Sequence, residues 1–245
     1  MQMRRRAGAP SPNANIARQR RFWTRNASSW HHHAANNPGL LKVLDAVIAE
    51  SSPSKGHAAV DLGCGSGQLA LRLAPEVASV IAVDISEAMI ELLRQSASDD
   101  GVTNVTAVAS AMEDFDLAPS SVDLVVSSYA LHHLHDSDKQ VVVNKAAQWL
   151  RPGGRLVIGD MMFGRGANAR DRAIIASKVR VFLTMGPGGW WRIVKNAGRY
   201  LFRTQERPVS VETWVQYLEQ AGLTSVHATN VVNEAAVVSG VRSAV

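Results

Sequence analysis

The feature that most constrains the fold is the stretch VDLGCGSGQLAL, residues 60–71, in which three glycines occupy alternate positions directly after a short apolar run. Glycine adopts positive φ at little cost and lets another group approach the main chain closely. In an open parallel sheet, ligands bind beyond the carboxyl ends of the strands, where a loop leads from strand to helix. The stretch therefore predicts a ligand-binding loop in a protein whose strands and helices alternate.

The rest of the chain repeats this alternation. Strand-like runs are expected at residues 57–62, 79–85, 105–110, 122–128 and 155–161. Helical patterns separate them at residues 67–76, 86–97 and 137–150, with Ser86 as the expected N-cap of the second. The RPGG sequence at residues 151–154 is expected to form a turn. Strands and helices that alternate in this way indicate a parallel sheet covered on both faces.

The C-terminal part breaks the alternation. After a helix expected at residues 210–222, two strand-like runs, 223–232 and 234–243, follow each other without an intervening helix. Such a pair forms a hairpin, so one of its strands must run antiparallel to an otherwise parallel sheet. The predicted fold class is α/β, with a doubly wound, seven-stranded, mostly parallel sheet, an antiparallel last strand and a helical insert.

The expected organisation has five parts. They are a disordered basic tail (1–12), an N-terminal helical cap (13–50), the α/β core (51–163), a basic helical insert that forms a lid (164–207) and the end of the α/β core (208–245). In the insert, Trp190, Val194, Ala197 and Leu201 share one face of an expected helix. Such a helix suits a lid over an apolar pocket, a membrane interface or a dimer contact.

Charge is distributed unevenly along the chain. The net charge is +5, but residues 1–25 carry +7, residues 26–163 carry −8 and residues 164–207 carry +8. This asymmetry points to an anionic partner, an anionic substrate or a membrane surface, and it is equally compatible with a well-solvated surface. Because no nucleic-acid motif accompanies the basic segments, we do not expect nucleic acid as a partner.

Two carboxylates accompany the glycine loop. Asp61 ends the first strand beside the glycines, and Asp84 ends the second strand, where a carboxylate can accept both hydroxyls of a ribose. A carboxylate at the mouth of the loop repels a phosphate and attracts a cationic amino group. The spacing G-x-G-x-G also differs from the dinucleotide fingerprint G-x-G-x-x-G. The site thus favours a nucleoside that carries an amino-acid tail.

With Asp61, the sequence DLGCGSG resembles the first motif of the class I S-adenosylmethionine-dependent methyltransferases. VIAVDIS resembles the second motif, which implies that Asp84 binds the ribose and Ile85 packs on adenine. VDLVVSSYALHHL and WLRPGGRLVIGD are similar to the segments that form the fourth and fifth strands of the family. The overall pattern is most similar to the branch that includes the menaquinone and ubiquinone methyltransferases.

The resemblance implies S-adenosyl-L-methionine as cofactor and a set of binding residues. They are Asp61, Gly63, Cys64, Gly65, Gly67, Asp84, Ile85, Ala111, Met112 and Ser127. The family often has an aspartate after the third strand that binds the adenine amino group, and this chain has Ser110 or Ala111 there. The contact can then come from the backbone of Ala111 and Met112, or from a displaced acid, Glu113 or Asp114.

Methyl transfer requires mainly that the acceptor be held in line with the methyl group and the sulfur atom. His132, His133 and Tyr129 follow the fourth strand and are the candidate catalytic residues; each histidine can equally serve in capping or packing. His31, His32 and His33 lie on the segment that covers the cofactor in similar enzymes. No metal site is expected there, because three consecutive side chains do not converge from one helix face.

The sequence thus predicts a methyltransferase for a small, apolar or lipid-like acceptor, methylated at oxygen, carbon or nitrogen. The alternatives are an NAD(P)-dependent oxidoreductase and a non-catalytic protein that acts at a membrane surface. The single cysteine, Cys64, permits no intrachain disulfide, and no apolar run approaches the length of a membrane span or a secretory signal. The expected location is cytoplasmic, with peripheral contact to an anionic membrane and oligomerisation left open.

Overall fold

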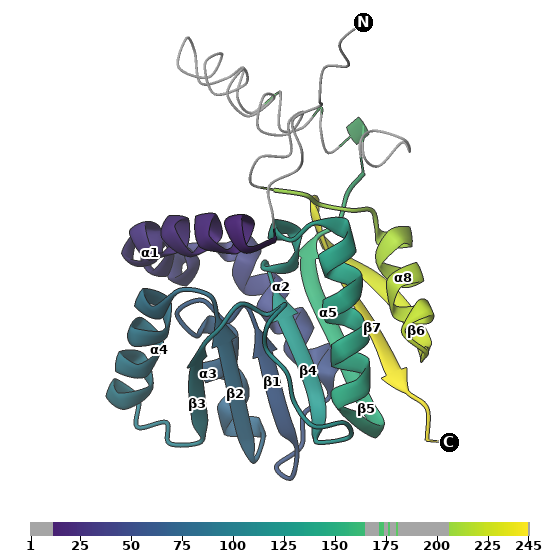
Figure 1. Cartoon of the computed structure of the whole chain (residues 1–245), viewed down its shortest axis with the longest axis horizontal. Coiled ribbons are helices and arrows are strands. Elements are labelled where there is room, and N and C mark those ends of the chain that lie inside the picture. The colour runs from purple at the N-terminus through teal and green to yellow at the C-terminus, as the bar shows by residue number, and fades with distance from the viewer. Residues whose placement is uncertain (1–11, 165–171, 174–175, 177–179, 181–205, 245) are drawn as a thin grey trace, which may run out of the picture.

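The computed structural model describes residues 12–164, 172–173, 176, 180 and 206–244 (Figure 1). The expected basic tail and the expected lid, with its apolar helix face at Trp190, lie outside the described residues except for residues 12, 164, 172–173, 176, 180 and 206–207. The arrangement of the remaining elements is nevertheless complete enough to define the fold and the edge of the sheet that carries the site.

The described residues form one sheet of seven strands in the order β3-β2-β1-β4-β5-β7-β6. The strands are β1 (Ala58–Leu62), β2 (Ser79–Asp84), β3 (Val105–Ala109), β4 (Val122–Ser128), β5 (Leu150–Met161), β6 (Leu223–Val232) and β7 (Ala235–Arg242). β1 to β5 pair in parallel, and β7 pairs antiparallel with both β5 and β6. The predicted doubly wound sheet with an antiparallel last strand is confirmed.

Helices cover both faces of this sheet. They are α1 (Pro12–Asn36), α2 (Pro38–Ser51), α3 (Gln68–Leu73), α4 (Glu87–Asp99), α5 (Asp136–Trp149) and α8 (Val211–Gln220), with short 3-10 turns η1 (Ala74–Glu76) and η2 (Leu131–His133). The buried residues of α2, α3 and α4 pack on one face, and those of α5 and α8 pack on the other. Among the described residues, no helix is both long enough and apolar enough to cross a membrane.

Side-chain caps determine where three of these helices begin. The predicted cap at Ser86 is confirmed, since its hydroxyl accepts a hydrogen bond from the backbone N–H of Met89. Asn37 caps α2 in the same way and precedes a proline at the first helical position. Ser210 caps α8. These residues satisfy backbone N–H groups that the first turn of a helix leaves without partners.

The expected turn at residues 151–154 takes the form of a bulge within β5. Val122 pairs with Leu150 and Leu124 pairs with Arg155, so four residues of β5 stand opposite the single residue Asp123. The strand therefore begins before the turn instead of after it. The side chain of Asp123 supports this arrangement, because its Oδ2 accepts hydrogen bonds from Ala58 N and from Arg151.

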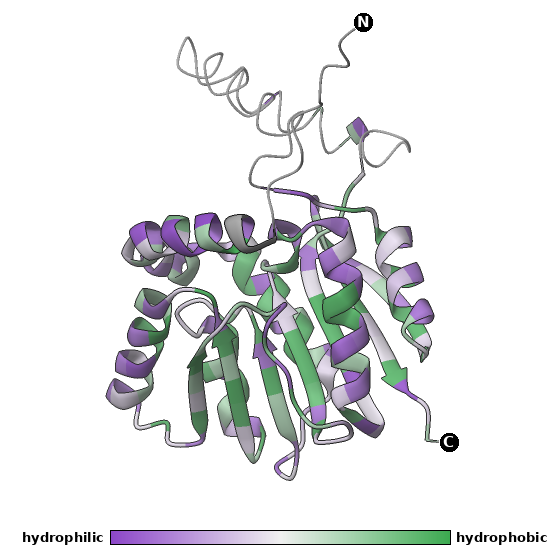
Figure 2. Cartoon of the chain, in the orientation of Figure 1, coloured by the Kyte–Doolittle hydropathy of each residue, from purple (hydrophilic) through white to green (hydrophobic). Residues whose placement is uncertain are grey.

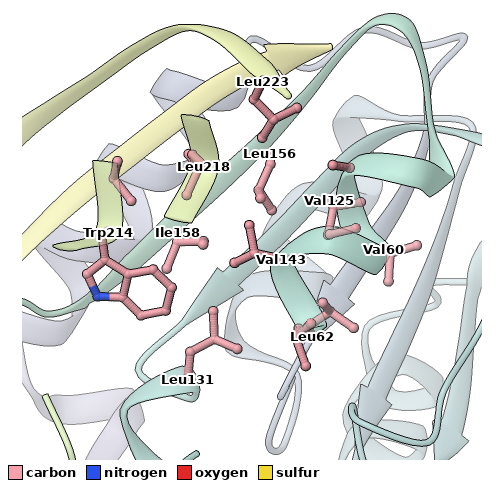
Figure 3. Close-up of a cluster of buried hydrophobic side chains, with 14 of the residues drawn as sticks. Val60, Leu62, Val125, Leu131, Val143, Leu156, Ile158, Trp214, Leu218 and Leu223 are labelled. Atoms are coloured by element: carbon pink, nitrogen blue, oxygen red, sulfur yellow. The ribbon is translucent and has the colours of Figure 1, made fainter. Parts of the chain in front are cut away.

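The core on the α5 and α8 face is a continuous apolar layer (Figure 3). Trp214 and Leu218 of α8 and Val143 of α5 pack against Leu156 and Ile158 of β5, all of them almost fully buried. Figure 2 shows the same division at the scale of the fold, with hydrophobic strands inside and hydrophilic residues on the outer sides of the helices. Burying a large side chain of this kind stabilises the fold by about 1.5–3 kcal/mol.

The helix α1 is placed differently from the others. It lies across the edge of the sheet toward which the parallel strands run, instead of covering a face (Figure 1). It packs against α4, and its Thr24 hydroxyl lies 3.3 Å from the Ser86 hydroxyl. The expected cap of residues 13–50 thus consists of a helix over the edge, α1, and a helix on the sheet, α2. The ends of β1, β2 and β4 lie beneath α1, which is where the candidate site is found.

Candidate functional site

A pocket opens between α1 and the carboxyl ends of the central strands. The space inside it, including its open mouth, is about 890 Å³. It is lined by Gln19, Trp23, Trp30, Ala34, Leu40, Leu44, Asp61, Gly63, Cys64, Gly65, Gln68, Leu69, Val83, Asp84, Ile85, Met89, Ser110, Met112, Glu113, Ser128, Tyr129, Ala130, His133 and Leu134. Aromatic and aliphatic side chains supply most of this wall, and three carboxylates supply its charge.

The glycine loop forms the floor of the pocket. The N–H groups of Gly63 and Cys64 both donate to the carbonyl of Val83 in β2, which fixes the loop to the neighbouring strand. Gly63 has φ +74°, and a Cβ placed on it would lie 2.2 Å from the Cβ of Ala130. The glycine at this position is therefore required by the chain's own packing, in addition to any ligand. Gly67 does not line the pocket and is the N-cap residue of α3.

Asp84 connects the loop to the second strand. Its Oδ2 accepts a hydrogen bond of 3.0 Å from Gly65 N, and its Oδ1 accepts one of 2.8 Å from Ser86 N. Burial raises the pKa of this carboxyl, and the two N–H groups partly offset the increase. Because each carboxylate oxygen has a second lone pair, Asp84 can still accept hydrogen bonds from a ligand in the pocket.

Asp61 is buried in the same wall, with 1% of its surface exposed. Neither of its carboxylate oxygens has a hydrogen-bond partner among the described residues. Burial, and then the negative charge of Asp84, raise the pKa of Asp61 to about 8, while the nearby backbone N–H of Ala70 lowers it only in part. A buried carboxylate without a partner is costly. This site is therefore suited to a ligand that brings a cationic hydrogen-bond donor.

The remaining residues expected around the cofactor fall into two groups. Cys64, Ile85 and Met112 line the pocket. Burial, together with the charges of Asp61 and Asp84, raises the pKa of the Cys64 thiol well above its usual value, so the thiol stays protonated. Ala111 and Ser127 do not line the pocket. The hydroxyl of Ser127 donates instead to the carbonyl of Leu62, at 2.7 Å.

Ser128, the neighbour of Ser127, faces the pocket in its place. Its hydroxyl is buried and has no partner among the residues that the structure describes. The signal that could have identified it is the alternation of side chains between the two faces of the sheet along β4. Ser128 falls on the same face as Leu124 and Val126, which belong to the core cluster that includes α2 and α3.

Of the candidates for the adenine contact, Met112 and Glu113 line the pocket, and so does Ser110. Asp114 does not. Burial raises the pKa of Glu113, and the charges of Asp138 and Asp114 add to this effect. The displaced acid that the sequence allowed is therefore available at Glu113.

Two of the three candidate catalytic residues reach the pocket, Tyr129 and His133. Tyr129 adopts a left-handed backbone conformation, with φ +49°, a strained geometry that occurs preferentially at functional sites. Burial, followed by the charges of Glu234 and Asp160, raises the pKa of its hydroxyl well above the usual value. The hydroxyl is therefore a hydrogen-bond donor at neutral pH.

His132 lies outside the pocket. Its side chain is 5% exposed, and its Nδ1 lies 2.5 Å from Oδ1 of Asp160. Oδ2 of Asp160 accepts the backbone N–H of His132. The adjacent His133 packs its ring edge-to-face against Trp23, with 5.0 Å between the ring centroids. The two histidines thus have different surroundings, one in a buried polar pair and one in the pocket wall.

The aromatic and amide side chains of α1 were missed in the sequence. Gln19, Trp23, Trp30 and Ala34 all line the pocket, and their spacing of four, seven and four residues places them on one helix face. That periodicity was the available signal.

The three consecutive histidines of α1 do not line the pocket, and the described part of the chain contains no group of three His, Cys, Asp or Glu side chains that could hold a metal ion.

Comparison with known proteins identifies a methyltransferase domain in this part of the chain. Residues 59–154, which include the glycine loop, Asp84 and β4, match a family described as a methyltransferase domain. An uncharacterised methyltransferase of Geobacillus sp. strain WCH70 is 32% identical over 140 residues, which are 57% of this chain and 62% of that protein. The chain thus matches less than two thirds of the length of this relative.

Solved structures show the same fold. A 1,6-didemethyltoxoflavin-N1-methyltransferase of Burkholderia thailandensis, with 1,6-didemethyltoxoflavin and S-adenosylhomocysteine bound, has a TM-score of 0.70 and 16% identity, covering 97% of this chain and 93% of that one. The YcgJ protein of Bacillus subtilis has a TM-score of 0.60 and 17% identity, covering 82% and 98%. Residues 59–154 match a methyltransferase domain, and the described part of the chain has the fold of the class I S-adenosylmethionine-dependent methyltransferases.

Proposed function

We propose that the protein transfers a methyl group from S-adenosyl-L-methionine to a small, largely apolar acceptor. The observation that carries this proposal is the unpartnered, buried carboxylate of Asp61 in a pocket that also contains the glycine loop and Asp84. A nucleoside with a cationic amino-acid tail satisfies both carboxylates at once: the tail ammonium pairs with Asp61, and the ribose hydroxyls donate to Asp84. Ile85 and Met112 then border adenine, and Glu113 is the acid available to its amino group.

The wall formed by α1, α2 and η2 is the part of the pocket proposed for the acceptor. Its apolar members are Trp23, Ala34, Leu40, Leu44 and Leu134. Among the described residues, no lysine or arginine lines the pocket, so an anionic acceptor would find no ion-pair partner there. The Burkholderia relative, whose structure contains 1,6-didemethyltoxoflavin, is consistent with a small-molecule acceptor for this chain.

The bound cofactor would supply an electrophilic methyl group on a sulfonium, and the protein's own contribution is alignment. His133 and Tyr129 are the residues proposed to contact the acceptor, since both line the pocket. Tyr129 would orient the acceptor by donating a hydrogen bond. His133 would accept a proton where the acceptor atom must lose one. His132 is proposed to position this segment through Asp160 instead of contacting substrate.

Calorimetric titration of the full chain with S-adenosylhomocysteine tests the cofactor assignment. Saturable binding to one site per chain is the expected result, and a well-folded protein that binds none would overturn the assignment. NADH serves as the matched comparison, since an oxidoreductase would bind NADH and ignore S-adenosylhomocysteine. A methyl-transfer assay with neutral aromatic and anionic acceptors then tests the acceptor proposal, for which neutral acceptors are expected to be preferred.

The sequence alternatives have no support from the comparisons, which point to methyltransferases. Membership of the menaquinone and ubiquinone branch remains a prediction, as do contact with an anionic membrane and oligomerisation. The membrane prediction depends on residues 164–207, most of which lie outside the described residues. Binding to anionic vesicles by the full chain, compared with binding to neutral vesicles, would test it.

A further inference from the structure

The indole N–H of Trp30 lies over the glycine loop. A Cβ placed on Gly65 would be 3.3 Å from Trp30 Nε1, which is closer than any other atom of the surroundings. This N–H donates to no acceptor among the described residues, although it lines the pocket. The ring packs edge-to-face against Trp23, at 5.6 Å between centroids, and at a tilt against His33, at 5.9 Å. The donor therefore points at the floor of the pocket without a protein partner.

The proposed cofactor would bring one group for which the described pocket lining supplies no lysine or arginine. Its amino-acid tail carries an ammonium and a carboxylate on the same carbon atom. When the ammonium pairs with Asp61, the carboxylate must lie within a few ångströms of the glycine loop. No described lysine or arginine lines the pocket, so a neutral donor of the described residues is the candidate to bind the carboxylate.

The other amide nitrogens on this side of the pocket each already donate one hydrogen bond within the protein. Gln68 Nε2 donates to the Ser66 hydroxyl at 2.9 Å, and Gln19 Nε2 donates to the carbonyl of His133 at 2.9 Å. The N–H of Gly65 donates to Asp84. Trp30 is left as the side-chain donor that is both adjacent to the loop and without an acceptor.

We propose that Trp30 Nε1–H binds the carboxylate of the cofactor's amino-acid tail, an inference that rests on the proposed function. The tail then bridges the two sides of the pocket, with its ammonium on β1 through Asp61 and its carboxylate on α1 through Trp30. Trp30 thus sets the specificity for a ligand with an intact amino-acid tail, and the bound ligand fastens α1 over the pocket.

The contribution of the contact between Trp30 and the tail carboxylate can be measured with two ligands that differ only in this carboxylate. S-adenosylhomocysteine carries the carboxylate, and 5′-deoxy-5′-(3-aminopropylthio)adenosine keeps the nucleoside, thioether and ammonium but lacks the carboxylate. Calorimetric titration of the full chain is expected to show a preference of about tenfold or more for S-adenosylhomocysteine, as for a hydrogen bond to a charged group. In Trp30→Phe, which keeps an aromatic ring without the N–H, this preference is expected to shrink to about threefold or less.

Phe22→Leu is the control, because Phe22 is an exposed aromatic residue of the same helix that does not line the pocket. It is expected to leave the preference between the two ligands unchanged. The proposal is overturned if Trp30→Phe retains the full preference, or if it weakens both ligands equally, which would indicate a general loss of packing. A wild-type protein that binds neither ligand would overturn the cofactor assignment itself, a result distinct from a lost preference.

Discussion

Gly65 and Asp84 are joined by a hydrogen bond of 3.0 Å from the glycine N–H to Oδ2 of the carboxylate. The two residues follow different strands, since Gly65 belongs to the loop after β1 and Asp84 ends β2. The carboxylate assigned to the ribose therefore also holds the loop assigned to the amino-acid tail. In the proposed binding mode, the ribose half and the amino-acid half of the pocket both depend on Asp84.

Asp84→Ala is consequently expected to weaken binding of S-adenosylhomocysteine by about 1.5–3 kcal/mol, as for the loss of hydrogen bonds to a charged group. Calorimetric titration measures the change directly. Asp45→Ala is the control, because Asp45 is an exposed carboxylate that pairs with Arg72 on the surface. Unchanged affinity in Asp84→Ala would contradict the ribose assignment.

The affinity for S-adenosylhomocysteine should also depend on pH. In the ligand-free protein the pKa of Asp61 is raised to about 8, chiefly by burial, whereas the tail ammonium requires the ionised carboxylate. Binding below pH 8 must therefore release a proton, so affinity is expected to fall as pH decreases, by up to tenfold per pH unit. Calorimetry in buffers of different ionisation enthalpy counts the protons released. If Asp61→Asn released the same number of protons as the wild type, Asp61 would be excluded as the source of the protons.

The same carboxyl affects the stability of the ligand-free fold. Its pKa is about 8 when folded and about 3.9 in an unfolded chain. The folded state holds the proton more tightly, so the contribution of Asp61 to stability is fully present below pH 4 and is lost as pH rises to about 8. Asp61→Asn has no ionisable group at this position, so its stability does not decrease in this way as the pH rises. Its melting temperature should exceed that of the wild type by a margin that grows from pH 5 to pH 8, and a margin independent of pH would contradict the raised pKa.

The local sequence was sufficient to predict the sheet, the glycine loop and the position of Asp61 and Asp84 beside that loop, because these depend on strand periodicity and on a short contiguous motif. It was insufficient for the segment after β4. There the chain leaves the alternation of a strand at Tyr129, whose φ is +49°, and enters a 3-10 turn. Which of two neighbouring residues faces the pocket then depends on tertiary contacts, so His133 lines it and His132 binds Asp160.

The part of the pocket proposed for the acceptor is a second feature that the sequence alone could not predict. Trp23 and Trp30 could be assigned to one helix face from their spacing, but the spacing does not say what that face covers. Only the position of α1 across the edge of the sheet brings both rings to the pocket. Most helices bury an apolar stripe against a sheet or another helix, and periodicity alone cannot distinguish such a stripe from the lining of a site.

The neighbours Ser127 and Ser128 offer a paired test. Ser127→Ala removes the hydrogen bond to the carbonyl of Leu62 and should destabilise the fold by about 1–3 kcal/mol while leaving ligand affinity unchanged. Ser128→Ala removes a buried hydroxyl without a protein partner, so it should leave stability unchanged or increased. It should weaken S-adenosylhomocysteine binding by about 1 kcal/mol where that hydroxyl contacts the ligand. Urea denaturation and calorimetry separate the two effects. If Ser127→Ala alone changed affinity, the assignment of Ser128 to the pocket would be wrong.

The last prediction concerns the close approach of Gly63 to Ala130. A methyl group at Gly63 would meet the Cβ of Ala130 at 2.2 Å, and the position also requires φ +74°. Gly101 has a similar φ of +66° with no atom within 4 Å of an added Cβ, so Gly101→Ala should cost only the left-handed conformation, about 1–2 kcal/mol. Gly63→Ala should cost about 1–3 kcal/mol more, because of the overpacking.

A second substitution isolates the clash from the backbone strain at Gly63. Ala130→Gly removes the methyl group that a side chain at position 63 would meet, so the double variant should recover part of the stability lost in Gly63→Ala. Urea denaturation of the four proteins in the cycle measures this coupling. Additive effects, with no recovery in the double variant, would show that Gly63 is required for its backbone conformation alone and that the β4–η2 segment does not press on the glycine loop.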